Sequence, residues 1–554
     1  MKLFSLFLLV TGGSFAQSPL LGLLSEELHR NFQVLSRKAD PPAYYIAYAV
    51  TDQETANVSA TLGVITGNDR RKMRVLDVTV RVGTPALDNY HTIRGEMGHF
   101  TAGIPIALDD SPDAIKLKLW SETDRCYRLA AQRLINIRTN KEVRVADKED
   151  SHDFSREQPE KFAAEAPRLL FDDAAWAARM RKLSAPFAKY PSILNSGLAV
   201  TAQREVKYLV NTEGTRVSHG QPFSRVTIQA QAKASDGMDL ATFDAFTAAD
   251  PANLPKDAEI AAAVDKVASD LNQLLDAPLV DPFVGPAILS GRAAGVFFHE
   301  IFGHRVEGHR LKDESDGQTF AKSVGSPVLP EFISVTFDPT LRQAAGEDLN
   351  GFYAFDDEGV KARRVTLVDG GILKTFLMSR TPVPGFESSN GHGRRQPGAE
   401  VVARQSNLLV ESTKQVPEAR LKEMLLEEIK RQNKPYGFYF QEITGGFTNT
   451  GRRGIQAFKV IPLVVYRVYA DGKQELVRGA DIVGTPLASF NKIIATGQKL
   501  EVFNGYCGAE SGNVPVSAVS PSILVSELEV QKKESSRDRP PLLSPPVIST
   551  GASK

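Results

Sequence analysis

Two histidines and a glutamate lie close together in the C-terminal half of the chain, in the sequence FHEIFGH at residues 298–304. Imidazole nitrogens are common zinc ligands, and a neighbouring carboxylate can act as a general base toward water on the metal. His299, Glu300 and His304 therefore indicate a zinc site with hydrolytic chemistry.

The spacing of the two histidines makes a prediction about the backbone. Histidines at i and i+4 lie about 40° apart around a regular helix, whereas His299 and His304, at i and i+5, lie about 140° apart. A π-type turn or an equivalent widening would bring both rings to one face, and Gly303 makes such a distortion inexpensive. The alternative is one buried and one solvated histidine, with Glu300 paired to His304. His309 extends the cluster but ranks below the first two histidines.

A catalytic zinc ion needs a third protein ligand and an open position for water. Cys507 lies between glycines in the sequence NGYCG, so its backbone can turn tightly and present the sulfur. The alternative is a small buried hydrophobic side chain, as most free cysteines are. The only other cysteine is Cys126. If Cys507 binds zinc, Cys126 must stay unpaired, and we expect it to be buried in a helix over residues 113–138.

Further short motifs lie in a fixed order over most of residues 285–530. They are FHE, GH and EG within residues 298–308, DDEG at 356–359, DGGIL at 369–373, NGHGRR at 390–395, and CG with VPV within 507–516. In this order they resemble the TldD/PmbA metalloproteases, the "modulator of DNA gyrase" family, whose metal motif is H-E-x-x-x-H with a distant cysteine.

The resemblance implies that His299, His304 and Cys507 hold Zn²⁺ and that Glu300 acts on the metal-bound water. It also implies an N-terminal α+β domain, a β-rich C-terminal domain, and peptides or unfolded polypeptides as substrates inside a dimer cavity. Metal-bearing members commonly pair with a related subunit that lacks the motif, so either a homodimer or a heterodimer is expected. Family members are typically cytoplasmic, and here this chain departs from the pattern.

Three further residues are candidates for supporting roles. Glu307 would accept the second N–H of a ligating imidazole, as carboxylates around zinc often do, or would be a solvated carboxylate at the helix end. Arg394 and Arg395 would bind a substrate carboxylate or line the cavity, or would lie in an exposed loop.

The N-terminus resembles an export signal. Lys2 precedes an apolar run over residues 3–10, and small residues at Ser14 and Ala16 favour cleavage after Ala16. The run is too short to span a bilayer, so we expect no stable membrane insertion and a periplasmic or secreted protein. Lys+Arg and Asp+Glu both number 66 in the 554 residues, which gives no basic excess for binding nucleic acid.

Apolar patterning predicts an α+β fold of two domains, and the second domain carries the metal-binding helix. The resemblance implies that this C-terminal domain is β-rich. The expected domains are residues 17–278 and 279–533, with an exposed polar linker at 146–165 and a disordered tail at 534–554. The predicted helices are 25–38, begun by Ser25, then 113–138, 258–275, 291–308 and 417–432. The predicted strands are 43–51, 56–65, 73–82, 197–210, 224–232, 285–289, 332–337, 365–368, 460–469 and 523–530, with turns at 66–69 and 211–214.

The hypothesis from the sequence is an exported zinc metallopeptidase that uses metal-activated water. One alternative is a non-catalytic peptide-binding subunit of a TldD/PmbA-like complex, which would have no use for Glu300 beside the metal. Another is a metal-dependent hydrolase of a different amide bond.

Overall fold

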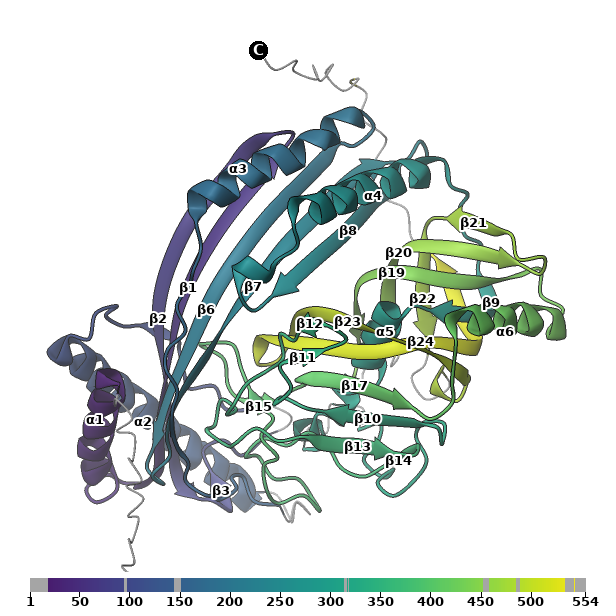
Figure 1. Cartoon of the computed structure of the whole chain (residues 1–554). Coiled ribbons are helices and arrows are strands. Elements are labelled where there is room, and N and C mark those ends of the chain that lie inside the picture. Colours follow the sequence, from purple (N-terminus) through teal and green to yellow (C-terminus); the bar gives the residue numbers. More distant parts are fainter. Residues whose placement is uncertain are drawn as a thin grey trace, which may run out of the picture.

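The computed structural model describes residues 18–93, 97–143, 151–312, 316, 318–451, 458–484, 489–533 and 543. Two large sheets dominate it: a long curved sheet from the N-terminal half, and a strand-rich C-terminal half that lies against its concave side (Figure 1). The predicted α+β class with a β-rich C-terminal region is confirmed.

The N-terminal sheet has the strand order β3-β2-β1-β6-β7-β5, with β4 beside β2 and β8 beside β7. Its long strands are antiparallel, and the short strand β5 runs parallel to β7. Alternating apolar side chains bury one face of each strand. Its strands are β1 Ala43–Thr61, β2 Val64–Thr84, β3 Leu87–Asp88, β4 Ile104–Pro105, β5 Lys161–Ala163, β6 Asn195–Asn211, β7 Arg216–Lys233 and β8 Asp239–Ala248.

The first hairpin is longer than the sequence predicted. β1 and β2 turn at Leu62 and Gly63, both with positive φ, and the predicted turn at 66–69 is wrong because Gly67 and Asn68 pair with β1. A two-residue turn with positive φ at both positions suits a hairpin, and polar residues in the exposed arms beyond it resemble a loop in sequence. The predicted turn at 211–214 joins β6 to β7, as expected.

Helices cover the sheet at its two ends (Figure 1). At one end α1 (Pro19–Leu35) packs against α2 (Pro112–Val143), and at the other α3 (Asp173–Ser184) lies near α4 (Asp257–Asp276). Ser25 does not begin the first helix, because α1 starts at Pro19 and the Ser25 hydroxyl donates to the Leu21 carbonyl. Cys126 lies buried in α2, as predicted.

The described part of the predicted linker, residues 151–165, is largely exposed as predicted, but it is anchored by a buried stretch at residues 153–155. Phe154 is buried against Tyr45, and the guanidinium groups of Arg81 and Arg380 lie 3.8 and 3.9 Å from the centre of its ring. Asp153 and Ser155 are buried beside it, and β5 pairs with β7. A single aromatic anchor and a short strand therefore hold this polar segment between the two halves of the molecule.

The C-terminal half is built on a mixed sheet in the order β14-β13-β10-β17-β24-β22-β20-β19-β9. Helix α5 (Gly291–Ile301) is buried against β24, β19 and β23, and α6 (Glu418–Arg431) covers another part of the sheet. The strands are β9 Phe283–Leu289, β10 Ile333–Phe337, β11 Gln343–Ala344, β12 Glu347–Asp348, β13 Val365–Asp369, β14 Ile372–Leu373, β15 Gly393–Arg394, β16 Val402–Ala403, β17 Asn407–Ser412, β18 Gln415–Val416, β19 Tyr436–Thr448, β20 Phe458–Tyr469, β21 Gln474–Val477, β22 Ala480–Gly484, β23 Ile493–Ala509 and β24 Gly512–Lys532.

Ion pairs and hydrogen bonds fasten C-terminal loops to the N-terminal sheet. Lys207 of β6 lies 2.6 Å from Asp357, and Arg380 lies 2.8 Å from Glu213. The Glu400 carboxylate accepts hydrogen bonds from the backbone N–H groups of Phe100 and Thr101. The concave face of the sheet is thereby held close to the loops that surround the histidine segment.

Residues 1–16, the predicted signal, lie outside the described residues, as do 146–150 of the predicted linker and all of the predicted tail except Leu543. Within the described chain, no helix has both the length and the apolarity that a membrane span requires.

Candidate metal centre

Helix α5 carries the first candidate ligand on its last turn. The Ser290 hydroxyl caps the helix by accepting a hydrogen bond from the Ala293 N–H, and an apolar run buries the helix in the C-terminal core. His299 and Glu300 are therefore placed by a rigid, fully packed element.

The π-type turn predicted between the two histidines is wrong. The α-helix ends at Ile301, Phe302 still bonds to Phe298 in the regular i→i+4 pattern, and residues 303–306 form a 3₁₀ turn. His304 therefore does not continue the helix, and the 140° divergence of a regular helix does not apply. The rings of His299 and His304 lie 5.1 Å apart between centroids.

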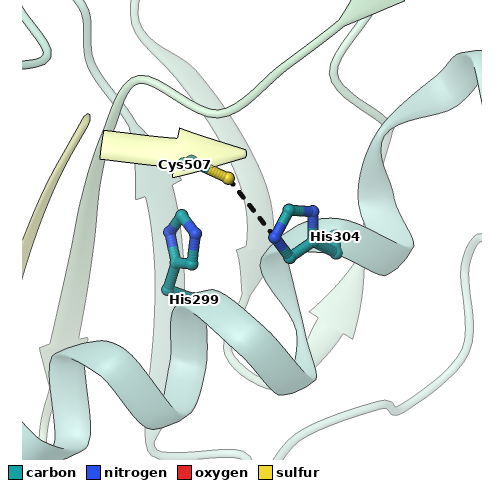
Figure 2. A group of neighbouring side chains, drawn as sticks. All are labelled: His299, His304 and Cys507. Carbon is teal, nitrogen blue, oxygen red and sulfur yellow. Dashed lines mark hydrogen bonds between the residues drawn. The ribbon is translucent and has the colours of Figure 1, made fainter. Parts of the chain in front are cut away.

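Cys507 approaches the two histidines from the opposite side, on β23 (Figure 2). Its sulfur lies 3.3 Å from Nε2 of His304, and the donor atoms of His299, His304 and Cys507 all lie within 4.8 Å of one another. Both cysteines of the chain are free, so the expectation that Cys126 stays unpaired is confirmed.

The three donors fit a zinc ion. A tetrahedral site with bonds of about 2.0–2.3 Å separates its nitrogen and sulfur ligands by about 3.4–3.6 Å. The distance of 3.3 Å between the sulfur and Nε2 of His304 is close to that range, the three donors together lie within 4.8 Å, and all three side chains are buried. Burial by itself would raise the pKa of the Cys507 thiol, but His304 and His299 outweigh it and hold that pKa well below its usual value. The thiolate, which is the form that binds metal, is thus favoured.

Glu300 lies beside the cluster with one carboxylate oxygen 3.9 Å from Nε2 of His304. Burial raises its pKa, and the neighbouring His299 and His304 partly oppose that shift. A buried carboxyl with a raised pKa is suited to taking up and returning a proton near neutral pH. Gly446 of β19 gives it room, since a Cβ there would lie 2.7 Å from Cγ of Glu300.

Glu307 is buried rather than solvated. Its Oε2 lies 3.2 Å from Nδ1 of His304 and 2.8 Å from a guanidinium nitrogen of Arg310, and its Oε1 lies 3.3 Å from Nε of Arg404. Although burial acts in the opposite direction, His304, Arg310 and Arg404 hold the pKa of Glu307 well below its usual value. A carboxylate in this position fixes the orientation and tautomer of the His304 ring.

The two arginines of the NGHGRR segment are buried, so the exposed-loop alternative is wrong. Arg394 donates to the carbonyl of Gln405 and stacks over Tyr353. Arg395 lies 3.8 Å from Asp77 and lines the cavity described next. His309 is also buried but lies apart from the three donors, with Nε2 3.6 Å from Glu510.

A cavity lies between the concave face of the N-terminal sheet and the loops that follow the histidine segment. It shares Arg310 and His309 with the surroundings of the donor cluster, and its walls are aromatic and charged. The lining includes Tyr45, Arg81, Phe154, His309, Arg310, Arg395 and Glu510.

Two neighbours of the donor cluster, Arg404 and Gln405, were missed in the sequence analysis. Arg404 is fully buried beside Cys507 and Glu307, and the side-chain amide of Gln405 donates to the carbonyl of His299 at 3.3 Å. Both follow the apolar run VVA at residues 401–403. A charged residue directly after such a run is the signal that could have indicated a buried Arg404.

Comparison with known proteins supports the resemblance proposed from the motifs. Residues 284–532 match the family model of the PmbA/TldA metallopeptidase C-terminal domain. The chain is 30% identical over 275 residues to a metalloprotease of Archaeoglobus fulgidus, covering 48% of this chain and 58% of that protein. It is 28% identical over 247 residues to a zinc metalloprotease TldD homolog of Saccharolobus solfataricus, covering 44% and 51% of the two chains. The chain spans about half the length of the curated relatives it matches.

The fold extends the similarity to the N-terminal half. The crystal structure of TldE from Thermococcus kodakarensis aligns with a TM-score of 0.62 at 14% identity and covers 92% of this chain and all of that one. The resemblance to the TldD/PmbA family is confirmed at residues 284–532, which match the model of that family's C-terminal domain.

Proposed function

We propose that this chain, whose C-terminal half matches a PmbA/TldA metallopeptidase domain, is a zinc metallopeptidase that hydrolyses peptides or unfolded polypeptides. The observation that carries the proposal is the convergence of His299, His304 and Cys507 within 4.8 Å beside the buried carboxyl of Glu300. The name of the Saccharolobus relative supports zinc as the metal.

The protein groups divide the chemistry among them. His299, His304 and Cys507 would hold the ion, which supplies Lewis acidity toward a water molecule and the scissile carbonyl when bound. Glu300 takes a proton from the attacking water and returns it to the leaving amine, a role that suits a carboxyl with a raised pKa. Glu307 keeps the Nδ1 side of His304 occupied, so that Nε2 faces the sulfur.

A polypeptide substrate is supported by the cavity between the two halves of the molecule. The cavity presents aromatic rings together with charged groups of both signs, which suits contact with varied side chains and with peptide backbone. A small apolar ligand would leave those charged groups unmatched.

The rival is a non-catalytic subunit of a TldD/PmbA-like complex that binds peptides on the same fold. It needs no buried carboxyl beside the donors, and Glu300 therefore favours the enzyme. The test is zinc content and peptide hydrolysis for the wild type and Glu300→Gln, with Glu442→Gln as a control. Glu442 is also partly buried with a pKa that burial raises, but it lies on β19 near Arg292.

The proposed enzyme gives zinc in all three proteins and hydrolysis in the wild type and in Glu442→Gln alone. Equal hydrolysis by Glu300→Gln would remove the assigned base. Absence of zinc and of hydrolysis in the wild type would favour the binding subunit.

We further propose export to the periplasm or beyond, and pairing with a second copy or a related subunit. The basis for export is the pattern of residues 1–16. Intact-mass measurement on protein from the native host should give a mature chain that begins at Gln17, and retention of Met1 would contradict export by this route. Mass photometry of the purified chain, alone and from its host, should show a dimer.

A further inference from the structure

Arg404 is a fully buried arginine between the two elements that supply the candidate ligands. It follows β16, and its backbone N–H donates to the carbonyl of His392. One guanidinium nitrogen donates to the carbonyl oxygen of Cys507 at 2.6 Å. The other terminal nitrogen donates to the Ser511 hydroxyl at 2.7 Å and to the Gly512 carbonyl at 3.0 Å.

The remaining nitrogen of Arg404 faces the other side of the site. Its Nε lies 3.3 Å from Oε1 of Glu307. Both atoms are buried and neither takes part in a hydrogen bond in the described parts of the chain, so their contact with each other is an ion pair. The second oxygen of Glu307 is the one that contacts Nδ1 of His304.

These contacts form one continuous connection between two ligands that are far apart in the sequence. It runs from the backbone of Cys507 through the guanidinium of Arg404 to Glu307, and from there to the ring of His304. The His304 side comes from the turn after α5, and the Cys507 side comes from the β23–β24 hairpin. The packing of α5 against β23 and β24 brings the two segments together, and the polar bridge adds a direct connection between the two ligands themselves.

We propose that Arg404 is a positioning residue that holds the Cys507 hairpin and the Glu307–His304 pair at the separation a metal ion requires. This inference rests on the proposed zinc centre and assigns the group that assembles it. Arg404 touches neither His299 nor Glu300 among its described contacts, so its effect is on the geometry of the site.

The chemistry of arginine suits this bridge better than that of lysine. A guanidinium is planar and presents five N–H donors in fixed directions, so it can serve a carboxylate on one edge and backbone carbonyls on another. A lysine ammonium is a point charge on a flexible stem and cannot span both sides at once. The positive charge of Arg404 also offsets the buried negative charges of Glu307 and of the Cys507 thiolate, which burial would otherwise disfavour.

The test measures metal binding by the full-length protein in Arg404→Lys and Arg404→Gln. Zinc affinity is obtained by competition with a chromophoric chelator, and the ligand geometry by the visible spectrum of the cobalt(II)-substituted protein. Arg380→Lys is the matched control, because Arg380 is an equally buried arginine that bonds to Ser155 and Glu213 instead. Circular dichroism and thermal unfolding of the metal-free proteins report folding separately.

The expected result is a loss of about 10–100-fold in zinc affinity for both Arg404 variants, the range found when outer groups around a metal are removed. Their cobalt spectra should shift, while Arg380→Lys loses thermal stability and keeps the wild-type affinity and spectrum. Wild-type affinity and an unchanged cobalt spectrum in Arg404→Lys and Arg404→Gln would overturn the proposal.

A double-variant cycle keeps the test decisive if the Arg404 variants fold poorly. Glu307→Gln removes the other end of the bridge, so Glu307→Gln with Arg404→Lys should lose less affinity than the product of the two single losses. Multiplicative losses would overturn the bridge. Failure of the zinc proposal itself is distinct, because then the wild type would bind no zinc, or His299→Ala would bind it as tightly as the wild type.

Discussion

The close contact between Gly303 and Gln405 gives a sharp test of how the histidine turn is built. A Cβ added at Gly303 would lie 1.9 Å from Oε1 and 2.6 Å from Nε2 of the Gln405 side chain. Gly303 does not adopt a left-handed backbone conformation, so Gly303→Ala acts through this overlap alone. The amide of Gln405 must move, and its hydrogen bond to the His299 carbonyl is then lost.

The magnitude follows from three contributions. Overpacking a buried site costs about 1–3 kcal/mol, and a lost hydrogen bond about 1 kcal/mol. Replacing glycine by alanine returns about 0.4–1 kcal/mol by restricting the unfolded chain. We therefore expect Gly303→Ala to lower the free energy of unfolding by about 2 kcal/mol, and to weaken zinc binding because His304 is the next residue.

Urea unfolding of the metal-free wild type, Gly303→Ala, Gln405→Ala and the double variant measures this effect. Gln405→Ala loses its own hydrogen bond but opens the space that the new methyl group needs. The double variant should therefore be more stable than the sum of the single losses predicts, by about 1 kcal/mol. Wild-type stability in Gly303→Ala, or losses that simply add, would refute the steric account of this turn.

Three further perturbations have clear expected outcomes. Cys507→Ser should abolish tight zinc binding and hydrolysis, whereas Cys126→Ser should keep both and lose about 1 kcal/mol of stability, as chelator competition and urea unfolding would show. Burial lowers the pKa of His392 to about 3, so between about pH 6.5 and pH 3 this histidine takes up a proton in the unfolded chain but not in the folded one. The free energy of unfolding should therefore fall as the pH drops through this range. In His392→Gln, urea unfolding should show this pH dependence reduced by about 1 kcal/mol per pH unit. Lys207→Met leaves the partly buried carboxylate of Asp357 without its ammonium partner and should lower the unfolding free energy by about 2 kcal/mol, with much less loss when Asp357→Asn is added.

The donors of the candidate site could be predicted because their identity is local information. The types and order of His299, Glu300 and His304 indicate metal chemistry without any structure, and the family motifs point to Cys507. The structure adds that a strand 203 residues beyond His304 places the sulfur at its ring. Long strands such as β6 and β20 could be predicted equally well, because a half-buried strand alternates apolar and polar residues in the sequence.

The backbone between the histidines could not be predicted from spacing. Where α5 ends depends on Gln405, whose side chain occupies the space in front of Gly303 and bonds to the helix's last turn. The predicted position of the first hairpin turn was wrong for a related reason. Thr66 and Asn68 have the composition of a turn, but they lie in exposed strand arms, while Leu62 takes the positive φ that a loop-forming residue would usually take.

The sequence left open whether several charged residues are buried. Glu307, Arg394, Arg395 and Arg404 are all buried, although charged residues are mostly exposed in proteins. Their burial is possible because each meets a partner from a distant segment, which no local pattern encodes. The resemblance named three of the four positions through neighbouring motifs, and Arg404 lay outside those motifs.

The distribution of these groups separates two tasks within the molecule. The candidate ligands, the proposed base and the arginine bridge all come from the C-terminal half, on α5, the turn after it, β23 and the segment after β16. The N-terminal sheet supplies none of those donors. Its residues Tyr45 and Arg81, together with Phe154 of the segment beside it, line the adjoining cavity. Changes on the concave face of that sheet should therefore alter which peptides are hydrolysed while zinc affinity stays constant. Changes around Arg404 should instead lower zinc affinity, and with it the hydrolysis of every peptide alike.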